Sequence, residues 1–295
     1  KEYMNFWKNN WPLAILLLAI TIFIIPVWRT GKIPMPADAL VGLYHPYRDY
    51  YAANFPSGIA YKNFLTTDPV RQLFLWKKLA VSQLQHGQMP WWNPYTHSGT
   101  TLLANFQTGV FYPLNFIFWL TNIIDAWTIF IILQLFLGGL FCYLFLRHQN
   151  LHSLACTFGS LSFIFGGFFM VWWEWGNIGH TLLWLPASLW AIEKYFQSKK
   201  PLFLILNSLF LSFSFFAGHL QTAFYIIIFN IAYALWRIKL SRLLLIAYCL
   251  LLVVTSVQWL PTLQLIKLSA RDIDQTQILT RSDWFLPWQH MVQFI

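Results

Sequence analysis

Charge is what this sequence has least of. Asp, Glu, Lys and Arg make up 10% of the 295 residues, whereas a soluble globular chain carries about 25%. Hydrophobic residues reach 58% and aromatic residues 20%. So few charges cannot cover a water-exposed surface, and this excludes a soluble protein. We predict an all-α membrane protein, because lipid offers the backbone no hydrogen-bond partners outside a helix.

Metal-ligand and nucleotide-binding patterns are also missing. Cys142, Cys156 and Cys249 lie in apolar runs without the spacing of metal ligands or of a disulfide framework. The sequence shows no Gly-rich phosphate loop and no dinucleotide fingerprint. Its net charge of +9 comes from cations at the ends of apolar runs, which indicates orientation in a membrane and not nucleic-acid binding. We predict no metal site built from His, because no pair has ligand spacing.

What the sequence does contain is a series of apolar runs suited to membrane-crossing helices. We predict spans at 11–28, 124–146, 153–172, 179–196, 202–217, 220–236 and 242–260. The first lacks a small-residue cleavage site and is therefore expected to be an anchor and not a signal peptide. Lys and Arg gather in alternate connections, which the positive-inside rule assigns to the cytoplasm together with the N-terminus. The fold class is thus a polytopic transmembrane helix bundle of about seven spans.

A first loop of unusual length, residues 29–120, falls outside the cytoplasm by the same rule. Loops this long are functional or form small domains. Its residues 69–86 have apolar positions at helical spacing, with Pro69 suited to the first turn, and predict an amphipathic helix at the membrane surface. On this helix we expect Lys77 and Lys78 to be headgroup anchors.

The domain organisation follows from these segments. We assign 1–28 to the first span, 29–120 to an extracytoplasmic loop domain, 121–261 to a six-helix bundle and 262–295 to the start of the next extracytoplasmic loop. No cap or stop signal ends the last segment. We therefore expect the chain to be part of a longer protein.

Three carboxylates of the first loop are candidates for a general base, which must reach the proton that it removes. They are Asp38, Asp49 and Asp68. Each has a structural alternative. Asp68 precedes Pro69 and can cap the start of a helix, Asp49 can pair with Arg48 in a solvated loop, and Asp38 can form an Asx-turn.

The short outer turns carry further polar side chains. His219 and Gln221 can present two hydrogen-bonding groups to a polar headgroup, although His219 can instead satisfy a helix end. In another outer turn Asn177 and His180 extend the same polar rim, with Glu174 nearby. These residues predict a polar site at the outer membrane face.

Arg71 stands in the first turn of the amphipathic helix predicted over 69–86. A guanidinium there can bind a phosphate through two parallel hydrogen bonds, and a helix N-terminus favours the same anion. The alternative is an arginine that is merely solvated on a polar helix face.

Several stretches of the chain resemble a known family, the YfhO-like bacterial membrane proteins. They run over residues 38–42, 47–49, 68–72, 87–95, 98–107, 111–113 and 218–221. The resemblance covers most of the chain from residue 37 to about 225. It implies membership of, or closeness to, the C-type glycosyltransferases, which are multi-span enzymes that use a lipid-linked sugar donor.

In that superfamily an acidic residue soon after the first span acts as catalytic base on the acceptor. By position the resemblance implies Asp38 first, Asp68 second and Asp49 third. It also implies contacts with the donor phosphate or sugar, at Arg71, His219, Gln221, Asn93 and Asn105. The first loop has no adjacent acidic pair and no Asp-x-Asp, so a metal-bridged donor site is not indicated, and participation of a divalent cation stays open.

The function implied is transfer of a sugar from a polyprenyl-phosphate donor to an envelope glycan or lipid, at the outer face of the bacterial cytoplasmic membrane. The donor is a substrate, and no other cofactor is implied. Two alternatives stay open. A transporter or flippase for lipid-linked glycan needs ionisable residues at mid-span, which the predicted spans lack. A non-catalytic envelope assembly protein can share the same fold.

Overall fold

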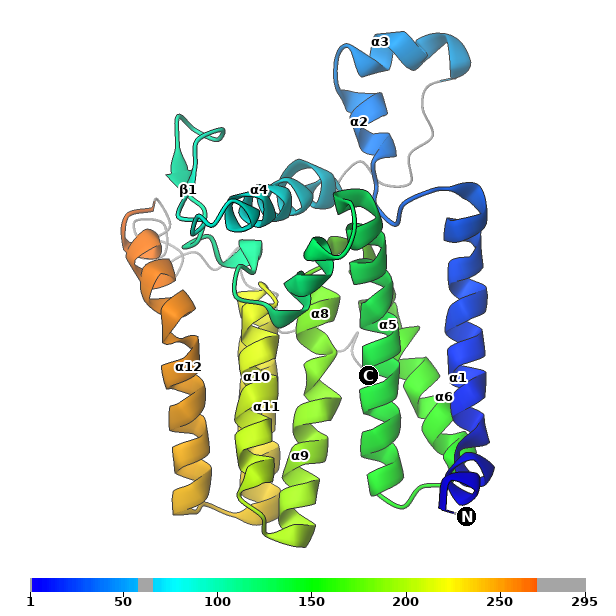
Figure 1. Ribbon diagram of the computed structural model, residues 1–295, viewed down its shortest axis with the longest axis vertical. Helices are drawn as coiled ribbons and strands as arrows, with labels where there is room; N and C mark the ends of the chain where they lie inside the picture. Colours follow the sequence, from blue (N-terminus) through cyan, green and yellow to red (C-terminus); the bar gives the residue numbers. More distant parts are fainter. Residues whose placement is uncertain (1, 58–65, 270–295) are drawn as a thin grey trace, which may run out of the picture.

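The computed structural model describes residues 2–57 and 66–269. Long helices stand side by side as a bundle, and one end of the bundle is covered by shorter elements (Figure 1). The bundle region contains α1 (Glu2–Thr30), α5 (Ile123–His148), α6 (Ser153–Ile164), α7 (Gly167–Val171), η5 (Trp173–Trp175), α8 (Ile178–Leu182), α9 (Trp184–Ser198), α10 (Leu202–Phe216), α11 (Leu220–Ile238) and α12 (Arg242–Lys267). In the described part of the chain the predicted helical class is confirmed.

The covered end is built by the first loop. Its elements are α2 (Asp38–Leu43), α3 (Tyr47–Tyr51), η1 (Ala52–Asn54), η2 (Pro69–Leu73), α4 (Phe74–Gln85), β1 (Trp92–Asn93), β2 (Thr100–Thr101), η3 (Phe106–Thr108) and η4 (Pro113–Trp119). The two strands pair antiparallel. Helix α4 lies across the bundle end, and α2 and α3 project beyond it as an arm (Figure 1). The helix predicted over 69–86 is present, with a π-helical first turn in η2.

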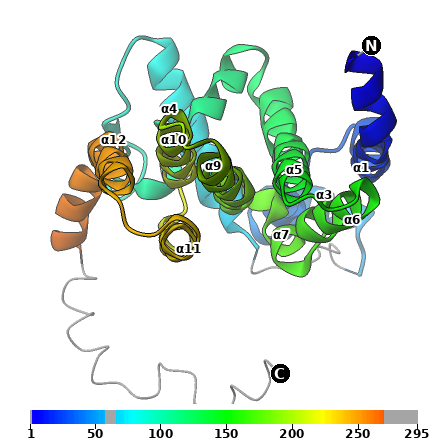
Figure 2. The same ribbon diagram turned by 90° about the horizontal axis from the view of Figure 1, so that it is seen from below.

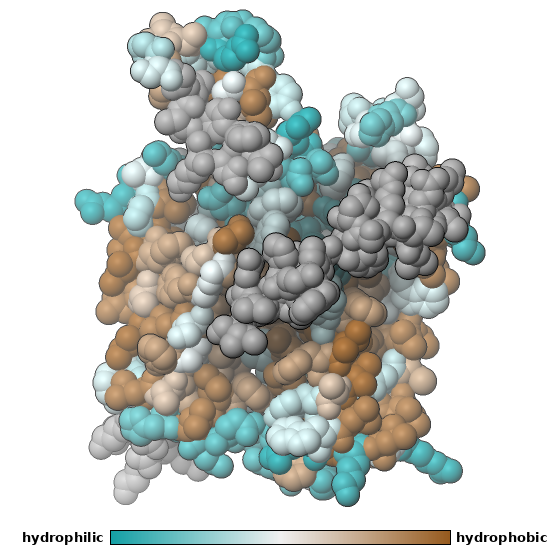
Figure 3. Space-filling model, turned by 180° about the vertical axis from the view of Figure 1, so that it is seen from behind, coloured by the Kyte–Doolittle hydropathy of each residue, from teal (hydrophilic) through white to brown (hydrophobic). Residues whose placement is uncertain are grey.

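Among the described residues, four helices are long and apolar enough to cross a membrane. They are Trp11–Thr30, Ile123–His148, Leu220–Ile238 and Arg242–Lys267, and two shorter apolar helices are Ser153–Ile164 and Leu202–Phe216. The space-filling view shows an apolar belt between two polar ends (Figure 3). The chain is therefore a membrane protein with several candidate spans. Each segment predicted to span contains helix, two of them with a break, while the count of seven stays a prediction.

Two of the predicted spans are interrupted. The segment 153–172 divides between α6 and α7, where Gly166 has an extended backbone (ψ 152°). The segment 179–196 divides at Leu183 into α8 and α9. Pro186, in the first turn of α9, has no N–H to donate to the carbonyl of Leu182, which favours a break there.

The connections at 149–152, 199–201 and 239–241 lie at one end of the bundle, opposite the first loop (Figure 1). These are the connections that the positive-inside rule assigned to one side. The structure thus agrees with the alternation of the connections. The assignment of this end to the cytoplasm stays a prediction, and residues 270–295 of the next predicted loop lie outside the described residues.

Helix α5 stands at the centre of the apolar core. Its Trp127, Phe130, Ile131 and Leu135 are fully buried, and α1, α6 and α9 pack around it. A pair of polar side chains joins α10 to α11. The side-chain amides of Asn207 and Asn230 bond each other at 3.0 and 3.3 Å, which suits an interior where unpaired polar groups are costly.

At the end opposite the first loop an ion pair links α9 to α11. Arg237 donates to both carboxylate oxygens of Glu193, at 2.7 and 3.0 Å, and the Glu193 side chain is 1% exposed. Replacing Arg237 by Leu would leave a buried carboxylate unpaired, which costs about 3–5 kcal/mol. We expect a clear drop in thermal stability in detergent. The double variant Glu193→Leu/Arg237→Leu should recover most of the lost stability. If the single and the double variant lost the same thermal stability, this account would be contradicted.

Candidate functional site

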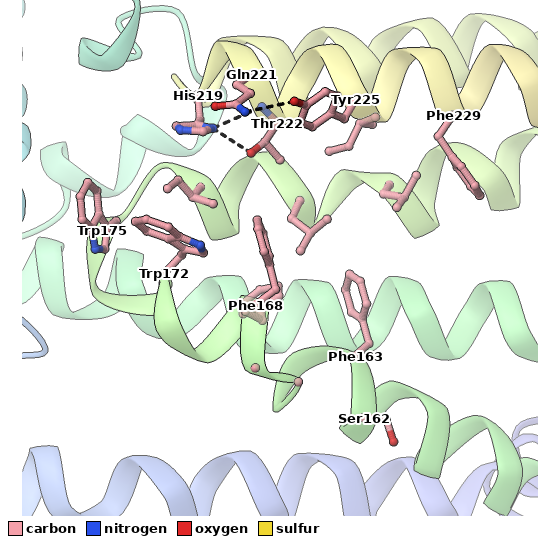
Figure 4. A pocket seen from close by; sticks show the side chains of 17 residues that line it. Ser162, Phe163, Phe168, Trp172, Trp175, His219, Gln221, Thr222, Tyr225 and Phe229 are labelled. Atoms are coloured by element: carbon pink, nitrogen blue, oxygen red, sulfur yellow. Dashed lines mark hydrogen bonds between the residues drawn. The ribbon is translucent and has the colours of Figure 1, made fainter. Parts of the chain in front are cut away.

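A groove of about 880 Å³ runs between α11 and the α6–α7 segment, and residues of α8 also line it. One wall comes from a single face of α11, with Thr222, Tyr225 and Phe229 among its residues. The facing wall includes Phe163 and Phe168 (Figure 4). Phe168 and Phe229 are each 53% exposed, so the groove is open along its side. We call it the membrane groove.

Most polar side chains of the membrane groove lie toward one end, and Ser162 lies at the other (Figure 4). His219 and Gln221 lie at the more polar end, facing Trp172 and Trp175, and phenylalanine rings follow along the length of the groove (Figure 4). The polar end is the N-terminal end of α11, next to the first loop (Figure 1). The groove therefore matches the shape of a lipid with a polar head and a long apolar chain.

The hydrogen bonds of His219 fix its tautomer. The backbone N–H of Thr222 donates to Nδ1 at 3.3 Å, and the Thr222 hydroxyl lies 2.7 Å from the same nitrogen. Burial lowers the pKa of His219 below its ordinary value. The ring is thus neutral at pH 7 with its proton on Nε2, which has no partner among the described residues. His219 both caps α11 and keeps one N–H donor for a ligand.

A second cavity, of about 750 Å³, lies at the C-terminal end of α1. Asp38 lines it together with Lys32, Thr66 and Glu174. One carboxyl oxygen of Asp38 accepts the backbone N–H of Ala39 at 3.1 Å, and the other has no partner among the described residues. We call this the Asp38 cavity. It combines an exposed carboxylate with an aromatic wall.

The two cavities are neighbours, because Trp175 lines both. The segment 170–175 separates the two cavities: Trp172 lines only the membrane groove, and Met170 lines only the Asp38 cavity. A third cavity of about 700 Å³ shares His219 and Gln221 with the membrane groove and adds Asn105. The structure thus brings His219, Gln221 and Asn105 together, and it places Asp38 beyond the Trp175 partition.

Other predicted site residues line none of these cavities. Asp49 is 63% exposed on the projecting arm, where it pairs with His45 and Arg48. Arg71 is exposed and lies over the Tyr44 ring, 5.6 Å from its centroid.

Two more predicted site residues make local hydrogen bonds. Asn93 is 4% exposed, and its side chain bonds Thr96 and the backbone of Tyr95 within the hairpin. Asp68 does not cap the helix: it makes no capping bond to a backbone N–H and accepts a bond from the Gln72 amide at 3.3 Å. The capping alternative for Asp68 is therefore wrong.

The predicted polar rim of Asn177 and His180 is also wrong. These side chains are 4% and 0% exposed. Asn177 donates to the carbonyl of Gly218 at 3.3 Å. His180 lies between the Tyr112 hydroxyl (2.9 Å) and the carbonyl of Phe130 (2.8 Å). Both residues stabilise the packing beneath the site and do not face a ligand.

Lys77 is not a headgroup anchor. It is 6% exposed, and its ammonium donates to Asn115 Oδ1 at 2.9 Å and to the carbonyl of Gly109 at 3.4 Å. Burial lowers its pKa from 10.5 to about 7. Lys77 therefore joins α4 to the segment 109–115. Lys78 is exposed, and its role as a headgroup anchor stays a prediction.

Sequence reasoning missed Trp172 and Trp175. They are two of 17 Trp residues, and nothing in their spacing separates them from interfacial tryptophans. The regular spacing of polar and aromatic residues along one face of α11 was a usable signal for the groove. Among the described residues no cluster of three or more His, Cys, Asp or Glu could hold a metal ion.

The fold and site define a class: a multi-helix membrane protein with an amphipathic groove and an acidic cavity at one end. The sequence matches the family described as bacterial membrane protein YfhO over residues 64–289. The chain belongs to this family, and the predicted resemblance is confirmed. No curated protein matches the chain. No solved structure matches it either.

Proposed function

We propose that this protein is a membrane glycosyltransferase that moves a sugar from a polyprenyl-phosphate donor to an envelope glycan or lipid, at the outer face of the bacterial cytoplasmic membrane. One observation carries the proposal. The membrane groove has a polar end, and that end adjoins a cavity with a carboxylate. A lipid-linked donor and a hydroxyl acceptor would need this pair of sites.

The donor would lie with its isoprenoid chain along the apolar part of the membrane groove. Its phosphate would then reach His219 and Gln221 at the start of α11. The Nε2–H of His219 can donate to a phosphate oxygen, and the N-terminus of a 19-residue helix favours an anion. The described lining of the groove has no Lys or Arg. The Nε2–H of His219 and the N-terminus of α11 would therefore stabilise the departing phosphate.

The acceptor would occupy the Asp38 cavity. Asp38 would take the proton from the acceptor hydroxyl as its oxygen bonds to C1 of the sugar. The bond between C1 and the phosphate oxygen breaks in the same step, and polyprenyl phosphate leaves with the electron pair. Of the three carboxylates predicted, Asp38 alone lines one of the three cavities, which supports its assignment as the base.

The proposal is tested by transfer of labelled sugar from synthetic polyprenyl-phosphate donors in proteoliposomes. Gly167 lines the membrane groove, and a Cβ added there meets nothing within 4 Å. We expect Gly167→Phe to fill the groove and reduce transfer at least tenfold with an unchanged melting temperature. The matched control is Leu252→Phe, at a position on α12 that is 59% exposed and lines none of the cavities.

Two outcomes would contradict the proposal. If wild-type protein transferred no sugar from any lipid-linked donor, the transporter and assembly alternatives would take its place. If Gly167→Phe and Leu252→Phe behaved alike in an active protein, the groove would not be the donor site.

A further inference from the structure

We infer that Trp172 and Trp175 form a platform that binds the sugar ring of the lipid-linked donor. The inference rests on the proposed function and names the part of the donor that these residues would recognise. Both tryptophans line the membrane groove, at the end that holds His219 and Gln221 (Figure 4). Nothing in the sequence assigns them a role.

The segment that carries them is held firmly from behind. The indole N–H of Trp173 donates to the carbonyl of Ile131 at 3.1 Å, and the Gln134 amide donates to the carbonyl of Trp173 at 2.6 Å. Gly176 ends the segment at φ +70°, and a Cβ there would lie 3.1 Å from Trp127 and Ile131. The buried face of α5 therefore fixes η5, and the backbone that carries Trp172 and Trp175 is rigid.

On the groove side the two rings are only partly buried. Their centroids lie 4.8 Å apart with an interplanar angle of 77°. Neither indole N–H has a hydrogen-bond partner among the described residues. Two rings at a large angle, each with a free donor, form an apolar corner with polar edges. Such a corner suits a ligand that is apolar on one face and hydroxylated at its rim.

A pyranose ring has this character, since its C–H bonds make an apolar face and its hydroxyls surround it. On the groove side the described lining around the platform carries neither Lys nor Arg, and in the Asp38 cavity, which Trp175 also lines, Lys32 stands with the carboxylates of Asp38 and Glu174. An uncharged sugar is therefore favoured over a sugar acid. A sugar on the platform would lie between the phosphate at His219 and the Asp38 cavity, because Trp175 borders both. This order suits attack on C1 from the side opposite the phosphate.

The test compares the affinity of purified, full-chain protein for two probes in detergent. One is synthetic polyprenyl phosphate, and the other is the same lipid carrying glucose, galactose or N-acetylglucosamine. We expect at least one sugar to raise the affinity roughly tenfold, the factor that corresponds to 1.4 kcal/mol. Trp175→Leu should remove this gain without changing the affinity for the bare lipid phosphate, and Trp175→Phe should keep most of it.

Trp236→Leu is the matched control, since Trp236 lies in the last turn of α11 and is 74% exposed. It should leave both affinities unchanged. If Trp175→Leu lowered both affinities equally, or left the sugar-dependent gain intact, the platform would be refuted while the donor groove stood. If neither probe bound wild-type protein, the proposed function itself would fail.

Discussion

Asp38→Asn is expected to abolish measurable sugar transfer, because general-base catalysis contributes about 10²–10⁴-fold. Asparagine has the shape of aspartate and cannot accept the proton of the acceptor hydroxyl. Since Asp38 lines its cavity with one carboxyl oxygen unpartnered among the described residues, the substitution should change the rate of transfer and not the fold. The measurement is initial rate in proteoliposomes, with donor binding as a second readout that should stay unchanged.

Asp125→Asn provides the matched control for this loss. Asp125 is an exposed carboxylate in the first turn of α5, at the same end of the molecule, and it lines none of the cavities. We expect it to keep full activity, as should Asp49→Asn on the projecting arm. Loss of transfer in Asp68→Asn together with full activity in Asp38→Asn would move the base to Asp68.

Lys77→Met is expected to flatten the dependence of stability on pH above neutrality. Burial lowers the pKa of Lys77 from 10.5 to about 7, so between these values the unfolded chain binds one proton more than the folded chain. The free energy of unfolding then rises with pH, by up to about 1.4 kcal/mol per pH unit for this group. Below about pH 7 both states are protonated and its contribution is constant.

The measurement is the melting temperature in detergent between pH 7 and 9 for wild type and variants. Lys78→Met is the control, because Lys78 is the exposed neighbour on the same helix. Subtracting the variant from wild type removes the titration of all other groups. A wild-type slope that persists in Lys77→Met would show that Lys77 is charged and stably accommodated in the folded protein.

The bundle was predictable because each helix is determined by the residues of its own stretch of sequence. A run of apolar residues long enough to cross lipid specifies one helix without reference to any other part of the chain. The amphipathic helix over 69–86 was predictable for the same reason. The breaks at Gly166 and Leu183 were not predicted, since an apolar run continues through both positions and hydropathy does not register a change of helix axis.

The candidate site was predictable only in its polar members. His219 and Gln221 stand out in a turn between apolar runs, and the structure places both at the end of the membrane groove. Their neighbours depend on contacts distant in sequence. Trp175 and Asp38 line the same cavity because η5 packs against η2 of the first loop. Lys77 is buried because the segment 109–115 folds back onto α4.

Because the membrane groove is open along its side, the protein would respond to the concentration of its ligand within the membrane and not in water. Helices α7 and α11, which line the groove, lie on the same side of the bundle (Figure 2). A lipid donor would enter between them from the surrounding leaflet, so its supply would be a mole fraction in two dimensions and not a molarity in water. Diluting the membrane with inert lipid would then slow the protein even when total donor and protein are held constant. A cell could regulate such a protein by changing the composition of its membrane, with no change to the protein itself.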